Sequence, residues 1–192
     1  MQQLILASSS PYRRAILDKL NLSYEANSPD IDESELENES AQDYVARLAV
    51  NKARALQARY PDALIIGSDQ TAIINGTIIG KPGNFENAVK QLQDASGQVI
   101  TFLTAVSVLN CRTNQMQTEV VPFSVHFRTL DAQMISNYLH AEQPYNCAGS
   151  FKSEGLGIVL FDKLEGDDPN TLIGLPLIRL IRMLENEGVK II

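Results

Sequence analysis

The pair Asn75-Gly76 is the local feature that most constrains the fold, because it lies between two short β-branched runs, Ala72–Ile74 and Thr77–Ile79. An Asn-Gly pair favours a type I′ turn, so this pattern predicts an antiparallel hairpin. By contrast, Leu4–Ala7 reads as a buried strand that leads into a helix start at Ser10-Pro11. A chain that combines βα units with hairpins is expected to form an α/β fold with a mixed β-sheet flanked by helices.

Hydrophobic periodicity and turn residues divide the rest of the chain into further elements. Apolar residues at helical spacing predict a helix from Ser40 to about Tyr60, and a glycine-rich polar stretch without a period predicts a functional loop over Pro144–Gly157. Further helices are expected from Pro11 through Leu20 and over Phe85–Asp94, Asp131–Ala141 and Leu175–Glu187. Further strands are expected over Ala63–Gly67, Val99–Leu109, Gln117–Arg128 and Ile158–Phe161.

The length of the chain fits one globular domain. With 192 residues, 44% of them apolar and 20% charged, the chain can bury a full core without disulfides or metals. We expect a single domain over residues 1–192, built as two lobes around a cleft. The two cysteines, Cys111 and Cys147, lack metal-ligand spacing, so a reduced protein is expected.

The net charge of −7 argues against a protein that coats long nucleic acids, because 16 Lys and Arg residues cannot form a broad basic surface. A few basic side chains can still converge on a small anionic ligand. No apolar run approaches the roughly 20 residues needed to cross a bilayer, and the N-terminus lacks the pattern of a signal peptide. We therefore expect a cytoplasmic protein without a membrane partner.

The segment Ser8–Pro11 and the two arginines that follow it, Arg13 and Arg14, form the first candidate site. Free amides, hydroxyls such as that of Ser8, and a bidentate guanidinium at a helix start are suited to binding phosphate. The alternative is a well-capped surface helix with solvated arginines, and the motif by itself favours neither. The glycines and the Gly-Lys-Ser/Thr ending of a Walker loop are absent.

Two charged residues stand at positions that are usually apolar or buried. Lys52 lies on the apolar face of its predicted helix, four residues from both Leu48 and Leu56. Its aliphatic stem therefore either lies along the apolar surface with the ammonium in solvent, or carries the ammonium to a partner in a cleft. Asp69 ends a predicted buried strand, where catalytic carboxylates of α/β proteins often lie, although an aspartate that opens a turn is at least as common.

An acidic loop carries Glu33, whose charge is interpreted either as solvated or as part of a site. For Glu35, Glu37 and Glu39 in the same loop we expect solvated side chains. Because the chain has only 2 histidines, a histidine-based metal site is not expected. Any metal would be a hard cation such as Mg²⁺ or Mn²⁺, held by carboxylates, water and substrate phosphate.

These charged groups together fit one reaction. Basic side chains neutralise the charge of phosphates, and paired carboxylates hold a metal or accept a proton from water. Metal-assisted cleavage of a phosphoanhydride requires both kinds of group. The basic residues are Arg13, Lys52 and Lys81, and the carboxylates are Glu33 and Asp69. The residues by themselves thus indicate a phosphate-handling α/β protein.

The segment Leu6–Leu17 (LASSSPYRRAIL) resembles the opening motif of the Maf family. Further matching segments follow in order along nearly the whole chain, namely Asp32-Glu33, Tyr44–Ala49, Asn51–Ala53, Gly67–Asp69, Gly80–Pro82 and Gly174–Pro176. The resemblance implies a nucleoside triphosphate pyrophosphatase. It also implies an elongated two-lobed fold, related to inosine triphosphate pyrophosphatases, with a central cleft.

Carried onto this chain, the family pattern implies a role for each candidate residue. The residues implied to bind phosphate are Ser8, Arg13, Lys52 and Lys81. Glu33 and Asp69 are implied to hold the divalent metal, and Asp69 to act as the proton acceptor or metal partner. These two carboxylates form the implied catalytic set together with Lys52 and Lys81.

Three positions depart from the branch of the family that acts on dTTP and UTP. That branch typically has Arg, Thr and Gln where this chain has Tyr12, Gln70 and Glu154, and this combination resembles the branch that acts on 7-methyl-GTP. Methylation makes guanine cationic, so the ring of Tyr12 can stack on it with a cation–π gain. The carboxylate of Glu154 can accept hydrogen bonds from the guanine N–H groups.

The resemblance leaves two alternatives open. One is a dTTP or UTP pyrophosphatase of the same family, and the other is a nucleotide-binding regulator of cell division without turnover. A structural adaptor is not indicated, because no exposed apolar stripe is visible. The expected partner is a small nucleotide, with no long nucleic acid and no membrane. The sequence leaves open whether the protein is a monomer or a homodimer.

Overall fold

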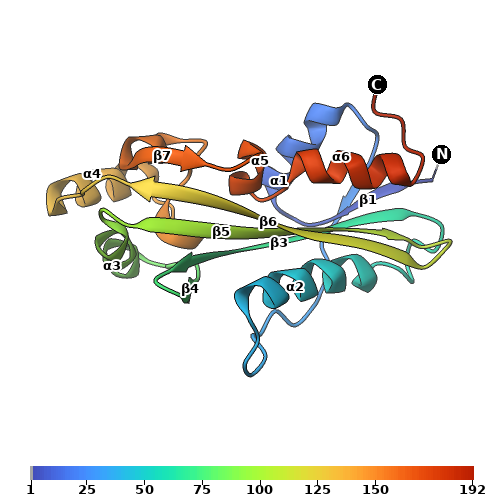
Figure 1. The fold of residues 1–192 in the computed structure, drawn as a ribbon, viewed down its shortest axis with the longest axis horizontal. Coiled ribbons are helices and arrows are strands. Elements are labelled where there is room, and N and C mark those ends of the chain that lie inside the picture. The colour runs from blue at the N-terminus through green and yellow to red at the C-terminus, as the bar shows by residue number, and fades with distance from the viewer. Residues whose placement is uncertain (1) are drawn as a thin grey trace. The chain divides into compact units, whose positions relative to one another are not determined.

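The structure is a computed structural model that describes residues 2–192, and Figure 1 shows how its elements follow one another. The strands are β1 (Leu4–Ala7), β2 (Glu25–Asn27), β3 (Leu64–Ile74), β4 (Thr77–Ile79), β5 (Val99–Asn110), β6 (Gln115–Phe127) and β7 (Phe161–Glu165). The α-helices are α1 (Pro11–Leu17), α2 (Ala41–Ala55), α3 (Phe85–Ala95), α4 (Ala132–Glu142), α5 (Pro169–Ile173) and α6 (Leu177–Asn186). Short 3₁₀ helices are η1 (Asp18–Leu20), η2 (Ala148–Ser150) and η3 (Leu156–Leu160).

The strands form a seven-stranded sheet in the order β2-β1-β3-β5-β6-β7, with β4 paired to β3. β1 runs parallel to both β2 and β3, whereas the pairs β3–β4 and β6–β7 are antiparallel. This confirms the predicted α/β class with a mixed sheet. Strand β2 was not predicted from the sequence, because its three residues carry only one apolar side chain.

The chain divides into two compact units. The first contains the residues up to Gln70, together with Thr104–Val121 and Asp168–Ile192. The second contains Thr71–Leu103 and Pro122–Asp167.

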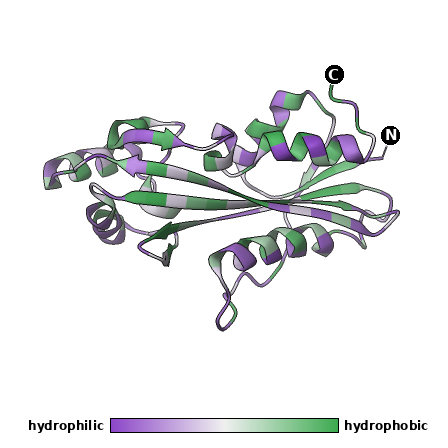
Figure 2. Cartoon of the chain, viewed as in Figure 1, coloured by the Kyte–Doolittle hydropathy of each residue, from purple (hydrophilic) through white to green (hydrophobic). Residues whose placement is uncertain are grey.

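In the first unit, alternate residues of β1 face two different apolar clusters. Leu4 and Leu6 pack in a cluster with residues of α1 and α6, whereas Ile5 and Ala7 pack with Ala53 of α2. Figure 1 shows α6 and α2 on opposite sides of the sheet here. A parallel strand buried on both faces is apolar at every position, which explains the run Leu4–Ala7. Figure 2 shows hydrophobic colour along the central strands and mixed hydrophobic and hydrophilic stripes on the helices.

In the second unit, four phenylalanines form an edge-to-face cluster with ring centroids 4.9 to 5.5 Å apart. They are Phe102 of β5, Phe127 of β6, Phe151 after η2 and Phe161 of β7. Aromatic rings prefer this geometry because the positive edge of one ring meets the negative face of another. The cluster fixes the segment around Phe151, within the predicted loop, against the strands of this unit.

The hairpin predicted at Asn75-Gly76 is confirmed. Ile74 of β3 lies opposite Thr77 of β4. Asn75 has φ 49° and Gly76 has φ 80°, the positive values that a type I′ turn needs.

The predicted start of the long helix is confirmed and its end is wrong. Ser40 caps α2 by accepting a hydrogen bond from the amide of Asp43. The helix ends at Ala55 rather than near Tyr60, because the amides of Leu56 and Gln57 bond to carbonyls three residues back and the last turns tighten.

The prediction that a strand ends at Asp69 is also wrong, because β3 continues without a break to Ile74. Polar side chains suggested a turn at this point. In the structure, each of Ser68, Asp69 and Gln70 has a polar partner that compensates its burial within the strand.

The predicted strand Ile158–Phe161 is placed too early. Ile158 and Val159 belong to η3 and are 53% and 44% exposed. The strand that does form is β7, which begins at Phe161 and pairs with β6 at the edge of the sheet. Its polar, exposed residues lack the apolar run that marks a buried strand.

Cys111 and Cys147 are both free cysteines in the structure. Within residues 2–192, none of the helices has the length and apolar character that a bilayer crossing requires.

Candidate active site

Lys52 is the centre of the candidate site in the first unit. Its Nζ lies 2.5 Å from Oδ1 of Asp69 and 2.7 Å from Oε1 of Glu33. The side chains of Lys52 and Asp69 are each 10% exposed, and that of Glu33 is 57% exposed. The ammonium of Lys52 therefore binds two carboxylates and does not extend to solvent, so of the two predicted arrangements the one with a partner is confirmed. The structure also brings together both predicted carboxylates.

The close packing of α2 on β3 allows this contact, and Gly67 is the residue that permits it. A Cβ on Gly67 would lie 2.0 Å from the carbonyl oxygen of Ala49 on α2. Any side chain at this position would push the helix away from the strand. Because Lys52 lies about one turn beyond Ala49 and Asp69 lies two residues beyond Gly67, this contact sets the distance between the two charges.

Arg13 is anchored through one nitrogen. Its Nε donates a hydrogen bond of 2.8 Å to the carbonyl of Gly174, and the terminal nitrogens make no hydrogen bond to another residue within 2–192. Burial lowers the pKa of Arg13, and the negative charges of Asp69 and Glu33 oppose this shift. The guanidinium is thus within electrostatic range of the same two carboxylates, and its two terminal nitrogens remain available for an anion.

The two serines before α1 have different roles. Ser10 is the N-cap, as predicted, and its Oγ accepts from the amide of Arg13 at 3.4 Å. Ser8 is buried, and its Oγ accepts from the amide of Ser10 at 3.1 Å. These bonds fix the backbone that leads from β1 to Arg13.

Sequence reasoning gave no role to Ser68, which shares the carbonyl of Gly174 with Arg13 through a hydrogen bond of 2.9 Å. Gly174 has φ 117° and ends α5. The sequence contained a signal for this position, because a glycine followed by Leu175-Pro176 is typical of a helix end. Its carbonyl connects the end of α5 to both the phosphate-binding candidate and β3.

Gln70 also binds α5, the helix that Gly174 ends. Its Nε2 lies 2.9 Å from the carbonyl of Thr171, 3.1 Å from that of Leu172 and 2.8 Å from Oγ1 of Thr104. The side-chain amide nitrogen therefore holds α5 against β3 and β5.

Tyr12 lies at the start of α1 with 38% of its surface exposed. Lys81 and Glu154 belong to the second unit. Lys81 is exposed after β4 and borders a groove of about 260 Å³ beside α3. Glu154 is exposed in the loop before η3, where its carboxylate accepts from the hydroxyl of Ser153 at 3.3 Å.

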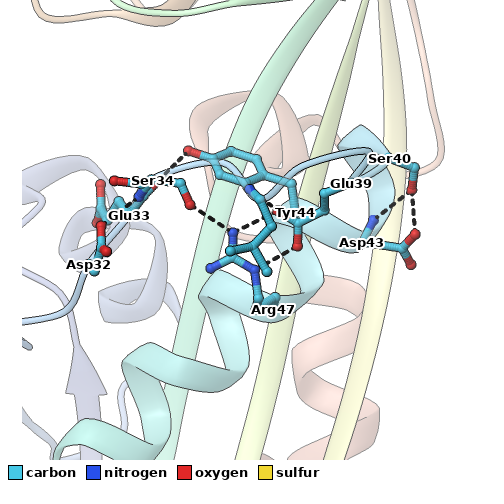
Figure 3. Close-up of polar contacts among 9 residues, drawn as sticks. Asp32, Glu33, Ser34, Glu39, Ser40, Asp43, Tyr44 and Arg47 are labelled. Carbon is cyan, nitrogen blue, oxygen red and sulfur yellow. Dashed lines mark hydrogen bonds and ion pairs between the residues drawn. The ribbon is translucent and has the colours of Figure 1, made fainter.

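The prediction that Glu39 is solvated is wrong. Its side chain is 9% exposed, and Arg47 binds it through Nε at 2.6 Å. Figure 3 shows this pair beside Tyr44 and the loop that carries Glu33. The sequence pattern concealed the pairing, because Glu39 lies eight residues from Arg47 and outside helix α2.

Glu33 and Asp69 also fit a hard cation. No group of three or more His, Cys, Asp or Glu residues suited to a metal occurs within residues 2–192. However, the ammonium of Lys52 between these two carboxylates shows that positive charge is stabilised at this point. Carboxylate oxygens suit Mg²⁺ or Mn²⁺, and Mg²⁺ usually combines one or two of them with waters and substrate phosphates.

The sequence model of the family described as Maf-like protein matches residues 3–187. The chain belongs to the Maf family. The matched range includes Lys52, Glu33 and Asp69, which together we call the Lys52 cluster.

Three curated relatives of this Maf protein are named 7-methyl-GTP pyrophosphatase. Each match covers 100% of this Maf protein's chain. The relative from Pseudomonas savastanoi pv. phaseolicola is 58% identical and that from Pseudomonas aeruginosa 56% identical, each covered over 100% of its own length. The relative from Colwellia psychrerythraea is 55% identical and covered over 96%.

Two solved structures share the fold of this Maf protein. They are the Staphylococcus aureus Ham1 protein, with a TM-score of 0.56 at 12% identity, and a HAM1 protein from Coxiella burnetii, with 0.54 at 13%. Each comparison covers 97% of this chain and 100% of the other.

Proposed function

We propose that this Maf protein is a pyrophosphatase that hydrolyses 7-methyl-GTP to 7-methyl-GMP and diphosphate. The observation that carries the proposal is the full-length identity of 55% to 58% to three proteins of that name. The Lys52 cluster supports the chemistry, because it joins a cation to two carboxylates whose charges also act on the anchored Arg13. Such an enzyme would act in the cytosol and remove modified nucleotides from the pool.

The reaction breaks the anhydride bond between the α- and β-phosphoryl groups and forms a P–O bond to the oxygen of water. In our proposal, Asp69 accepts the proton that the attacking water loses. Lys52, at 2.5 Å, orients this carboxylate. Diphosphate is the leaving group, and its charge has to be neutralised as it forms.

Four residues are proposed to bind the phosphates, and Arg13 has the best-defined geometry. With its Nε fixed on Gly174, the guanidinium can present its terminal nitrogens to two phosphate oxygens at once. Ser8, Lys52 and Lys81 complete this proposed set.

The proposed metal ligands are Glu33 and Asp69. Mg²⁺ or Mn²⁺, when bound, would neutralise charge on the phosphoryl oxygens. The ammonium of Lys52 lies against the same two carboxylates, so it would add a second positive charge beside phosphates held there.

Base specificity is proposed to depend on Tyr12 and Glu154. The exposed ring of Tyr12 offers a π-face to the cationic methylated guanine, and Glu154 offers acceptors for its N–H groups. Gln70 contributes indirectly in this proposal, because its Nε2 is already bonded to Thr104 and to the carbonyls of α5.

Product analysis with 7-methyl-GTP, GTP, dTTP, UTP and CTP in the presence of Mg²⁺ or Mn²⁺ tests the proposal. We expect diphosphate and 7-methyl-GMP, and a decrease in kcat of roughly 10² to 10⁴ in Asp69→Asn, the range for loss of a general base. The exposed variant Glu86→Gln on α3 is the control and keeps full activity.

Two other results would change the assignment. Preference for a pyrimidine triphosphate would retain the reaction and remove the roles of Tyr12 and Glu154. Tight binding of a triphosphate without turnover would indicate a nucleotide sensor.

A further inference from the structure

Glu33 lies on a segment that has little regular structure of its own. Residues 28–40 contain no helix or strand, and most of their side chains are exposed. Yet Oε1 of Glu33 is 2.7 Å from Nζ of Lys52. Ordering a backbone residue opposes folding by about 1 to 2 kcal/mol, so an exposed loop stays in one conformation only where other groups hold it.

Two side chains of α2 hold two consecutive backbone carbonyls of this loop, those of Glu33 and Ser34. Oη of Tyr44 donates to the carbonyl of Glu33 at 3.0 Å, and Nη2 of Arg47 donates to the carbonyl of Ser34 at 3.0 Å. Tyr44 and Arg47 are three residues apart and so lie on the same side of the helix. Figure 3 shows both side chains pointing toward this loop.

Glu39 locks Arg47 in this orientation from the other end of the loop. The guanidinium binds both carboxylate oxygens, Nε to Oε1 at 2.6 Å and Nη2 to Oε2 at 2.7 Å. The same carboxylate accepts from the amide of Leu36 at 3.2 Å. The bonds from Arg47 lower the pKa of Glu39, so the pair stays charged at neutral pH.

The helix thus carries both the residues that hold the loop and the residue that the loop must reach. Tyr44 and Lys52 are eight residues apart, which is slightly more than two turns, so they lie about 80° apart around α2. The guanidinium of Arg47 also lies 5.6 Å from the ring centroid of Tyr44. These contacts form one connected unit that ends at the Lys52–Asp69 pair.

We propose that Tyr44 and Arg47 are positioning residues that hold the carboxylate of Glu33 at the Lys52–Asp69 pair. The effect on catalysis rests on the proposed function. The positioning of Glu33 does not, because the loop contacts exist in the protein without ligand. Loss of Arg47 frees the loop, and Glu33 then spends most of its time away from Lys52. The alternative is that these contacts stabilise the fold and have no specific effect on Glu33.

Hydrogen exchange of the ligand-free protein tests the structural part. In Arg47→Gln we expect the amides of residues 33–38 to exchange at least tenfold faster, the factor that corresponds to about 1.4 kcal/mol of lost local stability. The amides of α2 around Lys52 should keep their protection. Arg54→Gln, which replaces an exposed arginine of the same helix, is the matched control and leaves the loop unchanged.

Titration with Mn²⁺ in the absence of nucleotide gives a second readout. We expect Arg47→Gln to weaken Mn²⁺ binding by roughly tenfold, at the lower end of what loss of a residue that orients a metal ligand produces. Tyr44→Phe, which removes a single hydrogen bond, should have a smaller effect in the same direction. It also serves if Arg47→Gln fails to fold.

A double-mutant cycle with Glu33→Gln then separates positioning from general stabilisation. If Arg47 acts through Glu33, Arg47→Gln lowers kcat/KM by roughly tenfold in the wild type and has little effect in Glu33→Gln. Equal losses in both backgrounds, or unchanged exchange of residues 33–38, would overturn the proposal. If the wild type cleaves no triphosphate, the proposed function fails, and hydrogen exchange still decides whether Arg47 holds the loop.

Discussion

Nζ of Lys52 on α2 lies 2.5 Å from Oδ1 of Asp69 in the middle of β3, and both side chains are only 10% exposed. The two charges stabilise each other in a place where either one by itself would be poorly solvated. Burial of a charge is strongly unfavourable unless the charge is paired and hydrogen-bonded. The pair therefore stabilises the first unit and also consists of two residues that we propose take part in catalysis.

Lys52→Met leaves the carboxylate of Asp69 buried without its main partner. We expect this variant to lose about 3 kcal/mol of unfolding free energy, the lower end for breaking a buried ion pair, measured by urea denaturation. In Lys52→Met/Asp69→Asn the unpaired charge is gone, so most of the loss of unfolding free energy should be recovered, while kcat stays at least roughly 10²-fold below that of the wild type. Equal stability of Lys52→Met and the wild type would show that solvent reaches Asp69 freely.

Gly67→Ala should destabilise the protein more than most single-methyl additions. The new Cβ would lie 2.0 Å from the carbonyl of Ala49, a backbone atom that cannot move without displacing α2. We expect a loss of about 3 kcal/mol or more in thermal or urea unfolding. Gly80→Ala is the control, because a Cβ there meets nothing within 4 Å. A stable Gly67→Ala protein with normal activity would contradict the close packing of α2 on β3.

Arg13→Lys should raise KM for the nucleotide by roughly tenfold to a hundredfold, the range for losing one hydrogen bond to a charged group. A lysine has no equivalent of the Nε that donates to Gly174, and its single ammonium cannot bind two phosphate oxygens in a fork. Steady-state kinetics check this result. Arg14→Lys, at the exposed neighbouring position, should behave as the wild type.

The unfolding free energy should decrease as the pH is lowered, because the carboxylate of Glu142 becomes protonated. Hydrogen bonds from the amide of Leu156 and from Lys152 lower the pKa of this group below its ordinary value of 4.5. A depressed pKa means that the stabilisation is fully present above about pH 4.5 and is lost as the pH falls through the lower folded value. The unfolding free energy, compared between wild type and Glu142→Gln, should therefore differ at pH 7 and converge in acid.

Glu86→Gln, at an exposed site on α3, is the control for this pH dependence and should follow the wild type throughout. A difference between Glu142→Gln and the wild type that stays constant down to about pH 3 would show that Glu142 does not act through its charge.

Tyr12→Ala should reduce the preference for 7-methyl-GTP over GTP by roughly threefold to thirtyfold, which corresponds to the usual strength of a cation–π contact. Tyr12→Phe retains an aromatic face and should retain most of the preference. The ratio of kcat/KM for the two nucleotides is the measurement. An unchanged ratio in Tyr12→Ala would remove the ring from the account of specificity.

Local patterns predicted the elements that depend on neighbouring residues. The apolar run Leu4–Ala7, the capping serine Ser10 and the Asn75-Gly76 turn all appear as expected, because each follows from short-range sterics and hydrogen bonding. The buried side of α2 also matches its apolar spacing. The helical pattern even placed Lys52 on that side, although it could not say what the lysine would contact.

The errors occur where a distant residue compensates a polar or exposed position. Asp69 was predicted to end a strand, but its ion pair with Lys52, seventeen residues away, stabilises it inside β3. Glu39 was predicted to be solvated, whereas Arg47 binds it in the structure. Strand β7 lacks an apolar run because its backbone pairs with β6 while its side chains remain exposed.

The sequence by itself thus determined the class of fold, the family motifs and the charged residues from which a site could be built. Only the tertiary structure decided which of these charges meet. Lys52, Glu33 and Asp69 converge because Gly67 lets α2 approach β3 and because Tyr44 and Arg47 bind the loop that carries Glu33. Such contacts join residues that are far apart in the chain, and no local pattern of hydrophobicity or turn residues specifies them.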